Sequence, residues 1–192
     1  MNQIRTFIAL DLPPAIQESI EKQTSRLRQT FGDDVIRWVP SHNMHLTLKF
    51  LGSIPVSHLD FIKRMLAQVA DLHTQFDLQI SGFGSFPNSN RPRVLWVGIH
   101  ASTSLTSLQT MIEDGANRLG YEKEARPFSP HLTLGRVRQG TNGKELQRIS
   151  NAISTIQLGK IGTARVDSVH LYQSNLNSKG STYTKLFSTP LR

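Results

Sequence analysis

The segments His45-Leu46-Thr47-Leu48 and His131-Leu132-Thr133-Leu134 decide how this sequence is interpreted. The same tetrapeptide, HLTL, occurs once in each half of the 192-residue chain. In a β-strand, successive side chains point to opposite faces. Each histidine therefore shares one face with its threonine, and the two leucines share the other. The pattern predicts two strands, each with an apolar leucine face and a polar histidine face.

The segments around each motif alternate between strand and helix patterns. Apolar residues spaced by three and four predict helices, and alternating or short apolar runs predict strands. We expect helices at 16–31, 59–69, 105–119 and 146–156, strands at 5–12, 45–51, 76–80, 94–99, 131–137, 164–172 and 183–188, a short apolar segment at 35–39, and a Gly-, Ser-, Asn- and Pro-rich loop at 81–93. Each half then runs strand, helix, strand, helix, strand. This order indicates an internal duplication, although it does not fix the order of the strands in a sheet.

The composition limits the class of protein. A length of 192 residues with 38% hydrophobic residues suits one domain, or two small lobes that share a core. The chain has no cysteine, which excludes disulfides, thiolate metal sites and a cysteine nucleophile. No apolar run approaches the length that crosses a bilayer. We expect a cytoplasmic protein that does not bind membranes.

The charge balance favours a polyanionic partner. The formal net charge is +8 and the sequence pI is about 10.2. A basic surface attracts nucleic acids and nucleotides electrostatically. The Lys and Arg residues are scattered along the chain instead of forming a basic tail, so this charge is expected to act through a folded surface.

The paired histidines suit the cleavage of a phosphodiester bond. In this reaction the attacking water must lose a proton and the leaving alkoxide must gain one. Histidine serves both roles because its pKa lies near neutrality. Threonine hydroxyls can donate hydrogen bonds to the non-bridging phosphate oxygens, where negative charge must be stabilised. His45 and His131 are therefore candidate catalytic residues, and Thr47 and Thr133 are candidate phosphate ligands.

The pairing carries this interpretation, since a single His-x-Thr or His-x-Ser is weak evidence. His100 also has a serine two residues later, but it lies at the end of a predicted strand and lacks the flanking apolar alternation. The alternative for His45 and His131 is that both are ordinary, half-exposed strand residues. The matching context of the two segments favours a catalytic role for both histidines.

The chain resembles a known family over nearly its whole length. HLTLKFLG (residues 45–52) and FSPHLTLGR (residues 128–136) are similar to the paired motifs of the two-histidine phosphoesterases. RTFIALDLP (residues 5–13), RVLWVG (residues 93–98) and LYQSNLNSKGSTYTKL (residues 171–186) resemble other strands of one branch. That branch is the RNA 2',3'-cyclic phosphodiesterases, historically called 2'-5' RNA ligases.

The resemblance implies an α+β fold within a single two-lobed domain over residues 1–192. The lobes would be pseudo-symmetric, with antiparallel-rich sheets lining a central cleft and helices outside. His45 would be the proton donor to the departing 3' oxygen, and His131 would be the proton acceptor that activates water. The product would be an RNA 2'-phosphate, formed without a metal, a cofactor or a covalent intermediate. The reverse type of reaction, 2'-5' ligation of RNA, is also implied.

Four further residues are candidate substrate contacts. Phe7 and Trp96 would look into the cleft and stack on bases, or would instead be core aromatics. Strict alternation puts Lys49 on the face of His45 as a phosphate contact, although a solvated surface lysine is the plain alternative. The same alternation puts Arg136 on the leucine face, unless a bulge at Gly135 turns it toward the phosphate.

The expected partner is an RNA or nucleotide with a cyclic phosphate end, bound by a monomer. Three alternatives remain open at this point. The substrate could be a 2'-5' oligoadenylate or another cyclic nucleotide. RNA ligation could be the physiological reaction, since it passes through the same phosphorus centre. The chain could also be a nucleotide- or RNA-binding module without turnover, although the presence of both His-Thr pairs argues against this.

Overall fold

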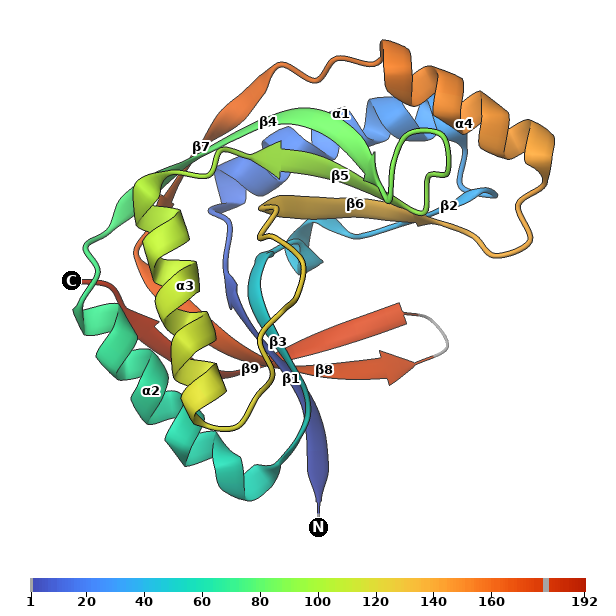
Figure 1. Ribbon diagram of the computed structural model, residues 1–192. Coiled ribbons are helices and arrows are strands. Elements are labelled where there is room, and N and C mark those ends of the chain that lie inside the picture. Colours follow the sequence, from blue (N-terminus) through green and yellow to red (C-terminus); the bar gives the residue numbers. More distant parts are fainter. Residues whose placement is uncertain (1, 178–179) are drawn as a thin grey trace.

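Strands and helices alternate along much of the chain, and the strands form two antiparallel sheets (Figure 1). The computed structural model describes residues 2–177 and 180–192. The helices are α1 (Pro14–Phe31), α2 (Leu59–Asp71), α3 (Thr103–Arg118) and α4 (Gly143–Thr155), with short 3-10 turns at Ser41–Asn43 and Val56–His58. Each α-helix lies where the apolar spacing predicts one.

Sheet A has four strands and sheet B has five. Sheet A has the order β3-β1-β8-β9, formed by β1 (Gln3–Leu10), β3 (Leu46–Pro55), β8 (Ser168–Asn177) and β9 (Gly180–Pro190). Sheet B has the order β2-β6-β5-β4-β7, formed by β2 (Ile36–Trp38), β4 (Phe76–Phe86), β5 (Val94–Ile99), β6 (His131–Val137) and β7 (Lys160–Val166). All neighbouring strands are antiparallel. The predicted α+β class with antiparallel sheets is confirmed.

Neither sheet is built from one half of the sequence. Strands β2 and β4 come from the first half but belong to sheet B, beside the second HLTL segment. The last two strands, β8 and β9, return to sheet A and pair next to β1. The duplication in the sequence therefore does not correspond to two consecutive folding units, because each lobe takes strands from both halves of the chain.

The helices pack on the outer, leucine-bearing faces of the sheets (Figure 1). Helices α2 and α3 pack against each other beside sheet A, and α1 and α4 pack against strands of sheet B. At α1, the side chain of Ile16 lies so close to Gly162 of β7 that any Cβ there would meet it at 2.5 Å. The histidine faces of the two sheets are consequently the faces opposite the helices.

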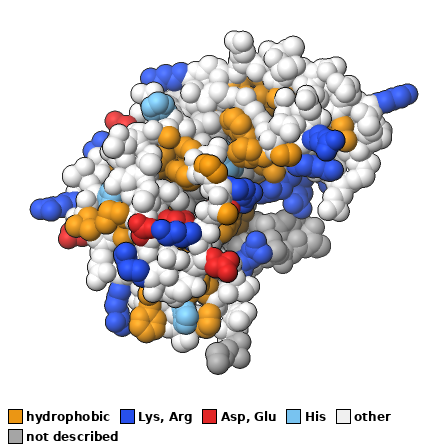
Figure 2. Space-filling model, viewed as in Figure 1, with side chains coloured by type: hydrophobic (Ala, Val, Ile, Leu, Met, Phe, Trp, Pro, Cys, Tyr) orange, Lys and Arg blue, Asp and Glu red, His pale blue; other side chains and the backbone are white. Residues whose placement is uncertain are grey.

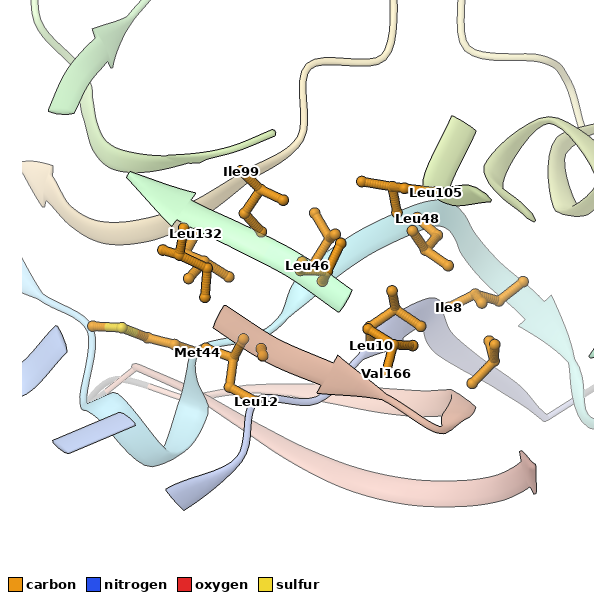
Figure 3. Packing of buried hydrophobic residues seen from close by; sticks show 14 of the residues in the cluster. Ile8, Leu10, Leu12, Met44, Leu46, Leu48, Ile99, Leu105, Leu132 and Val166 are labelled. Carbon is orange, nitrogen blue, oxygen red and sulfur yellow. The ribbon is translucent and has the colours of Figure 1, made fainter. Parts of the chain in front are cut away.

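The leucines of both HLTL segments belong to one hydrophobic core. Figure 3 shows Leu46 and Leu48 of β3 in the same packed cluster as Ile99 and Leu132 of sheet B. Leu46, Leu48, Leu132 and Leu134 are all at most 3% exposed. Burial of a leucine side chain contributes about 1.5–3 kcal/mol, so these residues anchor the two motif strands firmly. Strands β3 and β6 also contact each other directly.

Two expectations from the sequence are wrong in detail. Residues 81–86, expected in a loop, extend β4 to Phe86 because this segment pairs with β5. The strand expected at 164–172 is two strands, β7 and β8, separated at Asp167. The glycine and serine residues in 81–86 are typical of a loop, but pairing with β5 holds this segment as a strand. Among the described residues, no helix has both the length and the apolar character that a membrane span requires.

Candidate active site

His45 and His131 are held in the same way on their two strands. His45 directly precedes β3, and its Nδ1–H donates to the carbonyl of Asn43 at 2.9 Å. His131 begins β6, and its Nδ1–H donates to the carbonyl of Ser129 at 2.7 Å. A carbonyl oxygen only accepts hydrogen bonds, so Nδ1 must carry a proton in both rings. The second nitrogen, Nε2, is then left to exchange a proton with a ligand.

The threonines lie on the histidine faces, as alternation predicts. Thr47 pairs with Ala9 of β1, and Thr133 pairs with Trp96 of β5. Both threonines are partly exposed, whereas the leucines beside them are buried. Each sheet therefore presents an imidazole and a hydroxyl on the side opposite its core.

A β-bulge in β3 moves Lys49 off the face where strict alternation places it. Ala9 pairs with Thr47 but Ile8 pairs with Lys49, so Leu48 is the extra residue. A bulge of this kind puts two successive side chains on the same side of the strand. Lys49 consequently points toward the core, where its ammonium binds the carboxylate of Glu113 on α3 and the carbonyl of Glu122. With its side chain only 4% exposed, Lys49 is not placed to contact phosphate, and that prediction is wrong.

The same bulge occurs at the same place in β6 and brings Arg136 onto the histidine face. Trp96 pairs with Thr133 and Leu95 pairs with Gly135, which leaves Leu134 as the extra residue. Gly135 then faces the core, where a Cβ would lie 2.7 Å from Ile36 and 3.1 Å from Trp38. Arg136 emerges exposed on the opposite side. The bulge anticipated at Gly135 is therefore present.

Phe7 lies on the histidine face of sheet A, but beneath the side chains of that face. It is 2% exposed and stacks on the ring of His45, with 4.6 Å between the ring centroids. Tyr172 of β8 stacks at 5.4 Å from Phe7, and Tyr183 of β9 meets it edge-on at 5.2 Å. In this position Phe7 supports the ring of His45 and offers almost no surface to a base.

Trp96 is partly exposed on the histidine face of sheet B. Its ring covers Gly84 of β4 so closely that a Cβ there would lie 2.4 Å from the ring. Phe86 lies 5.4 Å from Trp96 and 4.8 Å from His131, measured between ring centroids. Each candidate catalytic histidine thus has an aromatic neighbour that limits its motion, Phe7 in one lobe and Phe86 in the other.

Asp11 is the centre of a polar network beside His45. Its carboxylate accepts hydrogen bonds from Tyr172 at 2.6 Å and Lys185 at 2.7 Å, and His170 Nε2 lies 3.4 Å away. Burial would raise the pKa of this carboxyl, but the hydrogen bonds from Lys185 and Tyr172 outweigh burial and keep the pKa below its ordinary value. Asp11 is therefore a carboxylate anion at neutral pH.

The charged neighbours of the two candidate histidines differ in sign. Burial lowers the pKa of both rings, and the hydrogen bond from Nδ1 to the backbone raises it in both. The negative charge of Asp11 further raises the pKa of His45. The positive charge of Arg136 further lowers the pKa of His131. The net shift is downward for each residue, but the charges around them favour protonated His45 and neutral His131.

Several residues of these faces were not identified from the sequence. Phe50, 63% exposed, follows the β3 bulge just as Arg136 follows the β6 bulge. Arg37, Phe86, Tyr172 and Tyr183 reach the histidine faces on other strands. Only the order of strands in the sheets brings the last four of these residues beside the motifs. Within residues 2–177 and 180–192, no group of three or more His, Asp or Glu side chains is placed to hold a metal ion.

Known proteins share this sequence pattern and this fold. A sequence model of the 2'-5' RNA ligase superfamily matches residues 13–177. The RNA 2',3'-cyclic phosphodiesterase of Methanocaldococcus jannaschii is 31% identical over 181 residues, covering 94% of this chain and 96% of that protein. The crystal structure of TT0787 of Thermus thermophilus has a TM-score of 0.82 at 27% identity and 98% coverage of both chains.

Escherichia coli LigT, crystallised in complex with 3'-AMP, gives a TM-score of 0.79 at 27% identity, with 99% of each chain covered. These similarities extend over both sheets and both HLTL segments. Because the superfamily model alone spans most of the sequence, the chain belongs to the 2'-5' RNA ligase superfamily.

Proposed function

We propose that this protein hydrolyses the 2',3'-cyclic phosphate at the end of RNA to a 2'-phosphate. Water attacks phosphorus and a P–O bond forms, while the bond from phosphorus to the 3' oxygen breaks. His131 Nε2 takes the proton of the water, and His45 Nε2 gives a proton to the departing 3' oxygen. The two imidazoles end with exchanged protonation states, and proton exchange with solvent restores them.

The observation that carries this proposal is the matched anchoring of the two imidazoles. In both motifs Nδ1 donates to the carbonyl two residues earlier, so Nε2, which has no hydrogen-bond partner among the described residues, can exchange a proton with a ligand. Strands β3 and β6 contact each other, which supports a site shared by both histidine faces. The name of the relative from M. jannaschii, an RNA 2',3'-cyclic phosphodiesterase, supports the substrate.

The surrounding charges support the assignment of acid and base. A nearby negative charge favours the protonated form of a histidine, and a nearby positive charge favours its neutral form. Asp11 favours the protonated form of His45, as a proton donor requires. Arg136 favours the neutral form of His131, as a proton acceptor requires. This agrees with the roles that the family resemblance implies.

Thr47, Thr133 and Arg136 are proposed to bind the phosphate. The two hydroxyl groups lie beside the imidazoles on the same faces and can donate to the non-bridging oxygens. Arg136 adds a guanidinium whose planar donors suit phosphate oxygens. No metal ion takes part in the proposed steps, since both proton transfers and the charge stabilisation are assigned to side chains.

The proposal is tested with an oligonucleotide that ends in a 2',3'-cyclic phosphate. Each proton transfer contributes about 10²–10⁴-fold, so His45→Ala and His131→Ala should each lower kcat by at least about 100-fold. His100→Ala is the matched control, because it replaces an exposed histidine in a similar His-x-Ser sequence. Near-normal turnover by either motif variant would remove that histidine from the chemistry.

The same assay separates the finer parts of the proposal. Identification of the product as the 2'-phosphate isomer tests which P–O bond breaks, and added chelator tests independence from metal. A faster reaction with 2'-5'-linked oligoadenylate would assign the site to that substrate instead. Incubation of a cyclic phosphate end with a 5'-hydroxyl end tests for the reverse reaction, 2'-5' ligation.

A further inference from the structure

Two arginines face each other across neighbouring strands at one edge of sheet B. Arg37 of β2 and Arg136 of β6 are direct partners in the antiparallel ladder, so their Cα atoms lie about 5 Å apart and their side chains share a face. Both side chains are exposed. Arg136 also pairs with Val94, two residues before Trp96 on β5, so the shared face is the histidine face.

This pairing is electrostatically unfavourable in the free protein. Like charges directly opposite in a sheet repel each other. In the described part of the chain, neither arginine has a carboxylate within ion-pairing distance. The other edge of sheet B differs, since Arg165 of β7 lies opposite Asp77 of β4 and binds it at 3.2 Å. The Arg37–Arg136 pair therefore keeps two positive charges available for an anion.

The position of Arg37 and Arg136 relative to His131 indicates which anion they bind. A strand rises about 3.3 Å per residue, so Arg136 leaves β6 roughly 15 Å from His131. Its charge still acts on the His131 ring, whereas Arg37 lies one strand further out. In Figure 2, Lys and Arg side chains gather in the middle of the visible face, between the upper and lower parts of the molecule. Positive charge is thus concentrated in this region of the visible surface.

We propose that Arg37 binds the phosphodiester group that precedes the cyclic phosphate in single-stranded RNA, next to Arg136 at the cyclic phosphate itself. This inference rests on the proposed function and specifies its substrate class as an oligonucleotide instead of a cyclic mononucleotide. Two guanidinium groups side by side can each bind one of two successive phosphates, since the planar donors of arginine match phosphate oxygens. Contacts to phosphate position a nucleic acid without reading its sequence, so the selection acts on length.

The test compares two substrates, adenosine 2',3'-cyclic phosphate and a trinucleotide with the same cyclic end. The parent protein should prefer the trinucleotide, measured as the ratio of the two kcat/KM values. Arg37→Gln should reduce this ratio about tenfold, the effect of losing one hydrogen-bonded charge contact. Arg37→Lys, which retains the charge, should restore part of the preference. Arg165→Gln is the matched control on the same sheet and should keep the parent ratio.

Each outcome decides one of the two proposals. An unchanged ratio in Arg37→Gln, or an absence of preference in the parent protein, would overturn the second phosphate site while leaving the hydrolase proposal intact. Failure of the parent protein to cleave either substrate would instead overturn the proposed function. Thermal unfolding of each variant shows that an altered ratio does not come from a loss of folded protein.

Discussion

At the scale of single residues, the two repeated segments differ first at the residue after HLTL. Lys49 and Gly135 occupy this position, and in both strands a bulge turns them toward the core. The next residues, Phe50 and Arg136, emerge exposed on the histidine faces. One lobe therefore offers an aromatic ring and the other a cation at matching places. An aromatic surface suits a base and a guanidinium suits a phosphate, so the two matching positions suit two different parts of a nucleotide.

The charge of Arg136 should be visible in the pH dependence of turnover. In the proposed mechanism His131 accepts a proton and must be neutral, so kcat/KM should fall as the pH drops through the pKa of His131. Burial lowers this pKa, and the Arg136 charge lowers it further. Arg136→Gln removes the repulsion and raises the pKa, which should move the acidic limb of the kcat/KM profile to higher pH.

The control for this measurement is Arg138→Gln, since Arg138 is an exposed arginine just beyond the same strand. It should leave the acidic limb in place. An acidic limb that stays fixed in Arg136→Gln, or moves to lower pH, would contradict the pairing of Arg136 with the proton acceptor.

At the scale of secondary-structure elements, Lys49 joins three parts of the fold. Its ammonium connects β3 to Glu113 on α3 and to the carbonyl of Glu122, in the segment that leads to β6. The same Glu113 carboxylate accepts the backbone N–H of Glu124 at 2.8 Å. The first motif strand thus holds the segment that carries Ser129, whose carbonyl orients His131. Lys49 is part of the support of the site instead of its phosphate-binding surface.

Replacing only the lysine of this ion pair should lower the stability of the protein. Lys49→Met leaves the mostly buried Glu113 carboxylate without its cation, and such changes lower the free energy of unfolding by about 3–5 kcal/mol. The double variant Lys49→Met with Glu113→Leu should recover much of the loss, since the unpaired charge is gone. Urea denaturation measures both values.

Lys63→Met provides the comparison for that experiment. Lys63 forms a 3.4 Å ion pair with Asp60, whose side chain is 74% exposed, and surface pairs contribute about 0–1 kcal/mol. If Lys49→Met were no less stable than Lys63→Met, the supporting role of Lys49 would be refuted.

Most of the elements could be predicted from the sequence, whereas the contacts between them could not. The spacing of Ile16, Ile20, Leu27 and Phe31 predicts α1, and all four residues are buried. HLTL predicts the two motif strands and their leucine cores. Strict alternation then failed at Lys49, because a bulge depends on pairing with the neighbouring strand. Arg37 could not be placed either, since β2 lies next to β6 only in the folded sheet.

At the scale of the whole molecule, the net charge of +8 should make turnover of RNA sensitive to salt. Each phosphate neutralised on a single strand contributes a slope of about −0.7 to the logarithm of affinity against the logarithm of salt concentration. With a second phosphate bound, kcat/KM for the trinucleotide should fall more steeply with salt than for the cyclic mononucleotide.

The measurement is kcat/KM for both substrates between about 50 and about 200 mM salt. Arg37→Gln should reduce the magnitude of the slope for the trinucleotide by about 0.7. The control variant Arg165→Gln should keep the slope of the parent protein. Parallel salt dependence of the two substrates in the parent protein would show that only one phosphate is engaged.

The return of β8 and β9 to sheet A has a consequence for how the protein is made. During synthesis, β1 and β3 leave the ribosome long before residues 168–190, yet β1 lies between β3 and β8 in the finished sheet. Until the last strands emerge, one edge of β1 lacks its backbone partner, and open strand edges invite pairing with other chains. The ring of Tyr172, which stacks on Phe7 beneath His45, also arrives only at this stage. In a nascent chain the surroundings of His45 are therefore complete only after β8 and β9 have been synthesised.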